Sequence, residues 1–267
     1  MPLAFKKTLA LILSVPVLAS SALMSCADTG PGAPRPVEHL RPEIIGTHAF
    51  DDSSFTQGLE LDGQDLVVGT GQYGDSRIYR SGIDGREYAS QDLPADDFGE
   101  GITIAGDHIW QLTWKSGIAY KRDRSSLEVL DRVPYPGEGW GICAGDGDVM
   151  YMSDGTSTLR TLDPETFEER GRVTVTSGTE PVSRLNELEC VGDEIYANIF
   201  QSTDIVRIDA DSGAVTAVID ASGLPNNAVP DVNNVLNGIA HIPGTDRFYL
   251  TGKRWPDLYE VEWVGGN

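Results

Sequence analysis

The sequence predicts an all-β protein, a five-bladed β-propeller whose last blade is closed by a strand from the N-terminal side of the chain. A short pattern of alternating apolar residues bordered by glycine recurs five times. Further short apolar strands follow each copy, and no run of ten or more residues after the N-terminal leader has helical periodicity. Four short strands for every ~40–50 residues are typical of propeller blades.

The repeat is measured from the residue that heads each copy. Successive heads are 43, 40, 46 and 51 residues apart, and each copy alternates with the two-residue period of a strand. A β-sandwich or barrel does not need five copies of one pattern, so the repeat favours the propeller. The heading residues are Gln57, Glu100, Trp140, Asn186 and Asn237.

The remaining strands follow these heads in order. Second strands are expected at 66–70, 109–114, 149–153, 195–200 and 248–251. Third strands are expected at 77–80, 118–121, 158–162, 205–208 and 258–261, and fourth strands at 127–133, 170–175 and 214–219. The last unit has only three strands, so the unassigned strand at 44–50 is expected to complete it and to cover an otherwise open edge.

The N-terminal residues predict export. Lys6 and Lys7 precede an uncharged stretch at 8–22, which Pro16 interrupts. The stretch is too short to span a bilayer of ~30 Å comfortably, so it is interpreted as a signal peptide. The protein is therefore expected to be a cell-envelope lipoprotein, or secreted or periplasmic.

Two cleavage sites compete. Residues 23–26 resemble a bacterial lipobox, in which Cys26 is lipidated and provides the only membrane contact. The alternative is ordinary cleavage near Ala22 or Ala27. The predicted organisation is a signal peptide with lipobox at 1–26, a Pro/Gly-rich tether at 27–42 and a propeller domain at 43–267.

The charge balance excludes one class of partner. Lys and Arg number 20 against 41 Asp and Glu, which gives a formal net charge of −21. A surface this acidic repels polyanions, so no nucleic acid is expected to bind.

The repeat also predicts where the site lies. The first strand of each propeller blade lines the central channel, so equivalent positions meet around one axis. Four heading residues are polar or charged and one is Trp, and the ends of the second strands add Trp114, Phe200 and Lys253. These positions are either turn residues around a wet channel or one pocket with a carboxylate, amides, an ammonium and an aromatic wall, which we favour.

Simpler site motifs are absent from the sequence. The four histidines are far apart, and no His/Cys cluster has zinc spacing. No Gly-x-Ser-x-Gly elbow occurs, and 69–71 lacks the helix that a phosphate loop needs. Residues 146–148 are too few for a calcium loop. No metal and no cofactor are therefore predicted.

Several motifs in order resemble one known family, the plant- and bacterial-type glutaminyl-peptide cyclotransferases. The similarity extends over roughly 44–263. It implies a five-bladed propeller that converts an N-terminal glutamine of peptides or proteins to pyroglutamate with loss of ammonia and without catalytic zinc. The motifs lie at 55–59, 98–103, 139–141, 153–157, 184–189, 197–201, 235–240 and 251–256.

The resemblance also implies the site residues. It assigns catalysis to Glu100, Lys253, Gln57 and Asn186. It assigns substrate binding to an aromatic wall of Phe55, Phe98, Trp114, Trp140 and Phe200. Plant members have Trp in place of Phe200, so the wall here lacks one N–H donor and some contact area. Trp255 is either part of the wall or blade packing.

The chemistry of the reaction suits these groups. Glu100 is expected to accept the proton of the substrate's α-ammonium and to return one to the departing ammonia. Lys253, with an amide N–H of Gln57 or Asn186, is expected to stabilise the oxyanion. Glu187 and Glu189 are the alternative acids, and strand alternation turns both away from the channel, so we predict structural roles for them.

Two other functions remain open. A non-catalytic, envelope-anchored propeller could bind a peptide or another small ligand through the same face, because fold does not fix function. A hydrolase with a channel calcium would need several channel carboxylates, and only Glu100 is available among the heading residues.

Two thiols remain after Cys26. Cys143 and Cys190 lie three and four places after the heads of successive copies, so their registers differ by one. A disulfide requires a Cα separation of ~4.4–6.8 Å, which this offset makes difficult. We therefore predict two buried free thiols in preference to a disulfide.

Overall fold

The computed structural model describes residues 1–2 and 36–266. The predicted signal peptide and Cys26 lie outside these described residues, apart from Met1 and Pro2, and so does most of the predicted tether. The described ranges contain strands and turns and no helix, so the all-β prediction is confirmed. No helix able to cross a membrane is present within them.

The strands form three sheets of four, one of eight and one of two. The first two sheets are β2 (Thr56–Asp62), β3 (Asp65–Thr70), β4 (Arg77–Gly82) and β5 (Glu87–Asp92), then β6 (Gly99–Ala105), β7 (His108–Thr113), β8 (Ile118–Asp123) and β9 (Val129–Pro134). The third is β10 (Ile142–Ala144), β11 (Met150–Met152), β12 (Thr158–Leu162) and β13 (Glu169–Thr174), and a hairpin of β14 (Thr176–Ser177) and β15 (Glu180–Pro181) follows. The eight-stranded sheet contains β16 (Leu185–Val191), β17 (Glu194–Ile199), β18 (Asp204–Asp209), β19 (Val215–Asp220), β20 (Leu236–His241), β21 (Arg247–Gly252), β22 (Asp257–Gly265) and β1 (Glu38–Ala49).

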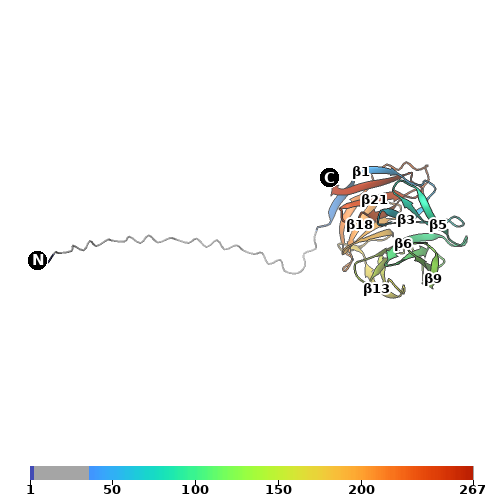
Figure 1. The fold of residues 1–267 in the computed structure, drawn as a ribbon, viewed down its shortest axis with the longest axis horizontal. Helices are drawn as coiled ribbons and strands as arrows, with labels where there is room; N and C mark the ends of the chain where they lie inside the picture. Colours follow the sequence, from blue (N-terminus) through green and yellow to red (C-terminus); the bar gives the residue numbers. More distant parts are fainter. Residues whose placement is uncertain (3–35, 267) are drawn as a thin grey trace. The chain divides into compact units, whose positions relative to one another are not determined.

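The eight-stranded sheet consists of two groups of four that β1 joins. One group is β16 to β19, and the other is β20 to β22 followed by β1. β1 pairs antiparallel with β22 over most of its length, as predicted for the strand at 44–50. Its first three residues also pair in parallel with β19, which fuses the two groups. The N-terminal strand and the C-terminal strand therefore lie side by side (Figure 1).

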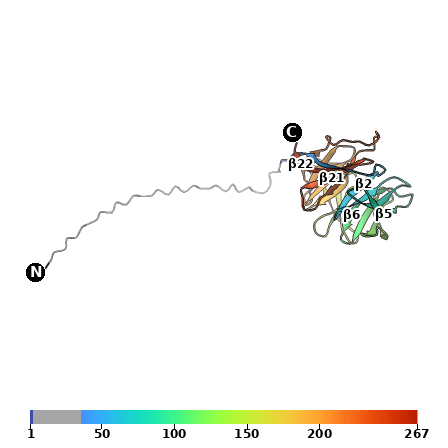
Figure 2. The same ribbon diagram turned by 45° about the horizontal axis from the view of Figure 1, so that its top comes forward.

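The first strands of the five groups form a closed ring. β2 contacts β6, β6 contacts β10, β10 contacts β16, β16 contacts β20, and β20 contacts β2 again. Figure 2 shows β2 and β6 next to each other. These strands are largely buried, whereas fourth strands such as β9 and β13 are mostly exposed with one half-buried face. In the three separate four-stranded sheets, burial therefore increases from the fourth strand towards the ring.

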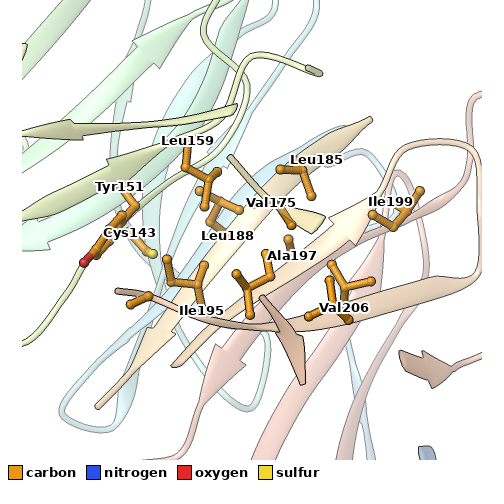
Figure 3. Packing of buried hydrophobic residues seen from close by; sticks show 13 residues of the cluster. Cys143, Tyr151, Leu159, Val175, Leu185, Leu188, Ile195, Ala197, Ile199 and Val206 are labelled. Atoms are coloured by element: carbon orange, nitrogen blue, oxygen red, sulfur yellow. The ribbon is translucent and has the colours of Figure 1, made fainter. Parts of the chain in front are cut away.

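Apolar side chains fill the spaces between neighbouring sheets. Figure 3 shows one such cluster, in which Cys143, Tyr151 and Leu159 of the third sheet meet Leu188 and Ile195 of the next. Comparable clusters lie between the other neighbours. Because each sheet buries both faces in this way, no single strand carries the hydrophobic core.

Cys143 and Cys190 form a disulfide, so the prediction of free thiols is wrong. Their Cα atoms are 5.5 Å apart, within the usual range. Gly141 explains why the offset registers are tolerated: a Cβ there would lie 2.0 Å from the carbonyl oxygen of Asn186. The missing side chain lets β10 and β16 approach closely enough for the bond to form.

One boundary and one strand differ from the sequence prediction. β1 begins at Glu38, so residues 38–42 belong to the sheet and not to the tether. β5 was not predicted at all. Both segments are mostly exposed and lack regular apolar alternation, so only their pairing with neighbouring strands defines them.

Candidate active site

The heading residues lie where the first strands are irregular. The register of the first strand shifts at Gln57, Glu100, Asn186 and Asn237, and the shift includes the head alone in β2 and the head with the next residue in the other three strands. A bulge of this kind turns a side chain out of the regular alternation. Trp140 lies two residues before the start of β10, and its carbonyl oxygen accepts a hydrogen bond from Gly101 N at 2.8 Å. The repeat thus places the same irregularity at one end of the ring in four of its five strands.

One cavity of about 270 Å³ gathers every catalytic and substrate-binding residue that the sequence predicted. Three of its polar groups come from first strands and one from the residue after β21, and its aromatic groups come from the adjoining loops. Two further residues line it that the sequence analysis did not find. The lining residues are Phe55, Gln57, Gln72, Phe98, Glu100, Trp114, Trp140, Asn186, Phe200, Asn233 and Lys253.

Glu100 and Lys253 are both buried in this cavity, each 4% exposed. Burial raises the pKa of Glu100 well above its usual range, and the negative charge of Glu138 raises it further. The positive charge of Lys253 and a hydrogen bond from Gln57 act in the opposite direction and lower this pKa. Burial lowers the pKa of Lys253 to about 8, although the charge of Glu100 raises it. The cavity therefore holds an acid and a base whose proton affinities have moved towards each other.

A chain of side-chain amides orients the polar end. Asn186 Nδ2 donates to Asn237 Oδ1 at 2.7 Å, and Asn237 Nδ2 donates to Gln57 Oε1 at 3.2 Å and to the carbonyl oxygen of Thr56 at 2.9 Å. Because the Gln57 oxygen accepts from Asn237, its amide nitrogen is free to donate to Glu100. Asn237, fully buried behind the cavity, is thus a positioning residue, and its place at the head of the fifth copy was the signal for it.

Lys253 lies between two aromatic rings. Its Nζ is 4.9 Å from the centroid of Phe55 and 5.2 Å from that of Phe200. Its backbone nitrogen donates to the carbonyl oxygen of Val235 at 2.9 Å, which fixes the segment after β21. Cation–π contacts of this kind partly replace the water that the ammonium loses on burial.

Glu138 connects the two indoles of the wall. Its Oε2 accepts hydrogen bonds from Trp114 Nε1 at 2.7 Å and from Trp140 Nε1 at 3.0 Å. Lys115 stacks on the ring of Trp114 with Nζ 3.8 Å from the centroid, and the same Nζ is 3.9 Å from Glu138 Oε1. Nothing in the period of the sequence indicated Glu138, because it lies in the loop before β10.

Glu187 and Glu189 have the structural contacts that we predicted, but not the predicted direction. Glu187 accepts from Leu59 N at 3.4 Å and Ile239 N at 3.0 Å, and Glu189 accepts from His241 N at 2.7 Å. Both therefore reach across to other strands of the ring. Strand alternation gave the wrong side because the register shifts between residues 185 and 188.

Trp255 packs away from the cavity. It is 4% exposed, belongs to a hydrophobic cluster and donates from Nε1 to the carbonyl oxygen of Asn234 at 3.1 Å. Of the two roles left open for it, blade packing is the one observed.

No cluster of three or more His, Cys, Asp or Glu side chains in the described ranges has the geometry to hold a metal ion. The polar groups that line the cavity are the carboxylate of Glu100, the ammonium of Lys253 and the side-chain amides of Gln57, Gln72 and Asn186. A fourth amide, that of Asn233, lies at the edge.

Comparison with known proteins identifies the family. The family model described as glutamine cyclotransferase matches residues 14–263. The chain belongs to the glutamine cyclotransferase family. A glutaminyl-peptide cyclotransferase of Arabidopsis thaliana is 34% identical over 226 residues, which cover 82% of this chain and 70% of that protein.

A solved structure of the same kind matches closely. The crystal structure of Myxococcus xanthus glutaminyl cyclase has a TM-score of 0.82 at 33% identity, and the match covers 86% of this glutamine cyclotransferase and 100% of that chain. The resemblance found in the sequence motifs is therefore confirmed over nearly the whole described fold.

Proposed function

We propose that this glutamine cyclotransferase converts the N-terminal glutamine of peptides or proteins to pyroglutamate and releases ammonia. Family membership supports the reaction. The observation that carries it is the polar end of the cavity, where buried Glu100 and Lys253 lie behind an aromatic wall. A module that only binds ligands has no need of both groups with shifted proton affinities.

Glu100 handles the protons in the proposed reaction. It accepts a proton from the substrate's α-ammonium, whose pKa is ~7.7–8.0 when free. The freed amine nitrogen then bonds to the γ-carboxamide carbon and closes a five-membered ring. Glu100 then gives that proton to the leaving nitrogen, and ammonia departs as the original C–N bond breaks. The carboxylate takes up the remaining extra proton of the ring nitrogen and releases it to solvent. The raised pKa of Glu100 makes it a stronger base for the first step.

Lys253 is the main donor to the oxyanion in this mechanism. The amide nitrogen of Gln57 is directed to Glu100, and one N–H of Asn186 is used by Asn237. The ammonium of Lys253 and the second N–H of Asn186 remain to stabilise the negative charge on the carboxamide oxygen. Groups of this kind act strongly where water is excluded, and both side chains are 3–4% exposed.

The fold behind this site is, we infer, a five-bladed propeller. Each group of four strands is one blade, and the parallel pairing of β1 with β19 joins the fourth and fifth blades into one sheet. The closed ring of first strands supports this number of blades.

Export and a lipid anchor at Cys26 complete the proposal. Both rest on the leader sequence and on the lipobox at 23–26. Labelling with a radioactive fatty acid in a bacterial host, compared with Cys26→Ser, tests the anchor.

The reaction is tested by mass spectrometry. A peptide that begins with Gln is incubated with the purified protein from residue 36 onward, and loss of ammonia is followed with and without a chelator. We expect cyclisation in both samples. A folded protein that cyclises no Gln-peptide would favour the non-catalytic binding function instead, and chelator inhibition reversed by a metal would contradict the metal-independent mechanism.

A further inference from the structure

The two ends of the cavity differ in exposure. Gln57, Glu100, Asn186 and Lys253 are each 3–4% exposed, whereas Gln72 is half-buried and Asn233 is exposed. The volume of about 270 Å³ is below the ~300–1,000 Å³ typical of ligand pockets. A cavity of this size has room for the glutamine residue that reacts. The rest of a peptide leaves through the open end, which Gln72 and Asn233 border together with the half-buried rings of Phe98, Trp114, Trp140 and Phe200.

Gln72 has a strained backbone. Its φ is 118°, in the region that favours glycine. Its carbonyl oxygen accepts from Asp75 N at 3.1 Å and from Ser76 Oγ at 2.7 Å, and Ser76 Oγ accepts from Gly99 N at 2.9 Å. The loop is thus tied to the start of β6. A glutamine kept in a conformation that suits glycine indicates that its side chain has a use.

Asn233 lies on the loop before β20, which its neighbour anchors. Asn234 is 4% exposed, its carbonyl oxygen accepts from Asn226 Nδ2 at 2.8 Å, and its own Nδ2 donates to the carbonyl oxygen of Val229 at 2.8 Å. Within residues 36–266, the side-chain amides of Gln72 and Asn233 have no hydrogen-bond partner. Two side-chain amides without an internal partner therefore border the mouth of the cavity, on loops whose backbone is anchored.

We propose that Gln72 and Asn233 form a subsite for the peptide backbone at the second residue of the substrate. A side-chain amide offers one acceptor and two donors, which match the N–H and C=O groups of a main chain. Recognition of the backbone leaves the side chain of the second residue in solvent, so the subsite accepts many sequences. It is distinct from the polar end, which acts on the glutamine itself. This subsite rests on the proposed function.

The test compares two substrates. Glutamine methyl ester lacks the N–H of the second residue and the whole chain beyond it. Gln-Ala-Ala amide has this N–H and two further residues. In the Gln72→Gly, Asn233→Ala double variant we expect KM for the peptide to rise about tenfold, the equivalent of one or two net hydrogen bonds. We expect KM for the ester to stay within about twofold of wild type. Equal effects on both substrates, or none on either, would overturn the subsite.

The single variant Gln72→Gly separates binding from folding. Glycine relieves the strained φ, so its melting temperature should be equal to or above that of wild type while peptide KM rises. A lower melting temperature would overturn the strain argument. Gln64→Ala, an exposed glutamine in the turn between β2 and β3, is the matched control and should change neither KM. Wild-type turnover of the methyl ester reports on the proposed function separately, because the ester does not use this subsite.

Discussion

Glu100 and Glu187 are both buried, but they have different neighbours. Glu100 lines the cavity, whereas Glu187 accepts two backbone N–H groups from β2 and β20. Glu100→Gln is close in shape and cannot take up the amine proton, so we expect turnover to fall by ~10²–10⁴. Glu187→Gln should leave kcat within a few-fold and lower the unfolding free energy by ~1–3 kcal/mol, because an amide N–H then faces a backbone donor. The reverse pattern in kcat and urea titrations would show that the catalytic acid is misassigned.

Lys253 is expected to set the alkaline limit of activity. Burial lowers its pKa to about 8, and the mechanism needs its charged form. Activity should therefore fall as pH rises through about 8, even though the substrate amine is then more often neutral. Lys253→Met should remove this alkaline fall and reduce kcat by ~10²–10³. Lys121→Met, on β8, is the control and should keep the wild-type pH profile; an unchanged alkaline limb in Lys253→Met would refute the role.

Glu138 is expected to hold the two indoles in place. In Glu138→Ala both indole N–H groups lose their acceptor, so we expect KM to rise by about three- to tenfold, with kcat less affected. Glu138→Gln keeps an acceptor oxygen and should restore KM to near the wild-type value. Tryptophan emission, measured on the same variants, should shift in Glu138→Ala only. Wild-type KM and emission in Glu138→Ala would argue against this role.

At the scale of strands, the Cys143–Cys190 disulfide links β10 to β16 directly at the ring. Both cysteines are interior residues of neighbouring sheets, 47 positions apart in sequence, so the bond restricts a long loop of the unfolded chain. Replacing both by Ala should lower the unfolding free energy by ~2–4 kcal/mol. Thiol titration of denatured, unreduced protein lacking Cys26 should find no reactive thiol. Two reactive thiols would contradict the bond.

The bulges in the first strands are the element-scale device that builds the site. A regular strand would send alternate residues into the space between sheets, as it does for Leu59 and Ile239. The register shifts next to Gln57 and Asn237 instead turn these heads towards the common end of the ring. Catalytic geometry thus comes from one irregularity repeated on different strands.

At the scale of the whole molecule, three more glutamates lie within the ring. Burial raises the pKa of Glu60 to about 7 and also raises those of Glu187 and Glu189, and the negative charges of their neighbours add to the effect. Glu60 also faces Thr103 and the Ile104 N–H on β6, and the charges of Asp62 and Arg124. Its carboxylate accepts from Ile104 N at 3.0 Å, which ties β2 to β6. Contacts between the first strands of the ring therefore include glutamate side chains whose pKa values are raised.

These groups predict how stability depends on pH. Glu60 ionises near 4.5 when unfolded and near 7 when folded, so between these values the folded state binds more protons. Stability is then highest at the acid end of this window and falls as pH rises through about 7. The melting temperature of wild type should drop between pH 5 and 8, and Glu60→Gln should lessen the drop. Glu168→Gln on the surface should leave it unchanged; an identical drop in Glu60→Gln would exclude this explanation.

The sequence by itself determined the repeat, and with it much of the fold. Apolar alternation and turn residues are local properties, so strands such as β7 and β18 and the heads at Glu100 and Asn186 could be found without a structure. The family motifs then indicated the site residues, and the cavity contains all of them.

Only the tertiary structure decided features that depend on how close separate strands lie. β5 and the start of β1 have little apolar pattern and exist through pairing, the disulfide depends on the close approach at Gly141, and the direction of Glu187 depends on a bulge. Gln72 and Glu138 lie in loops, where no period constrains a residue. Gln72 reaches the cavity and Glu138 reaches Trp114 only because the fold brings separate segments together, and local patterns carry no information about such distances.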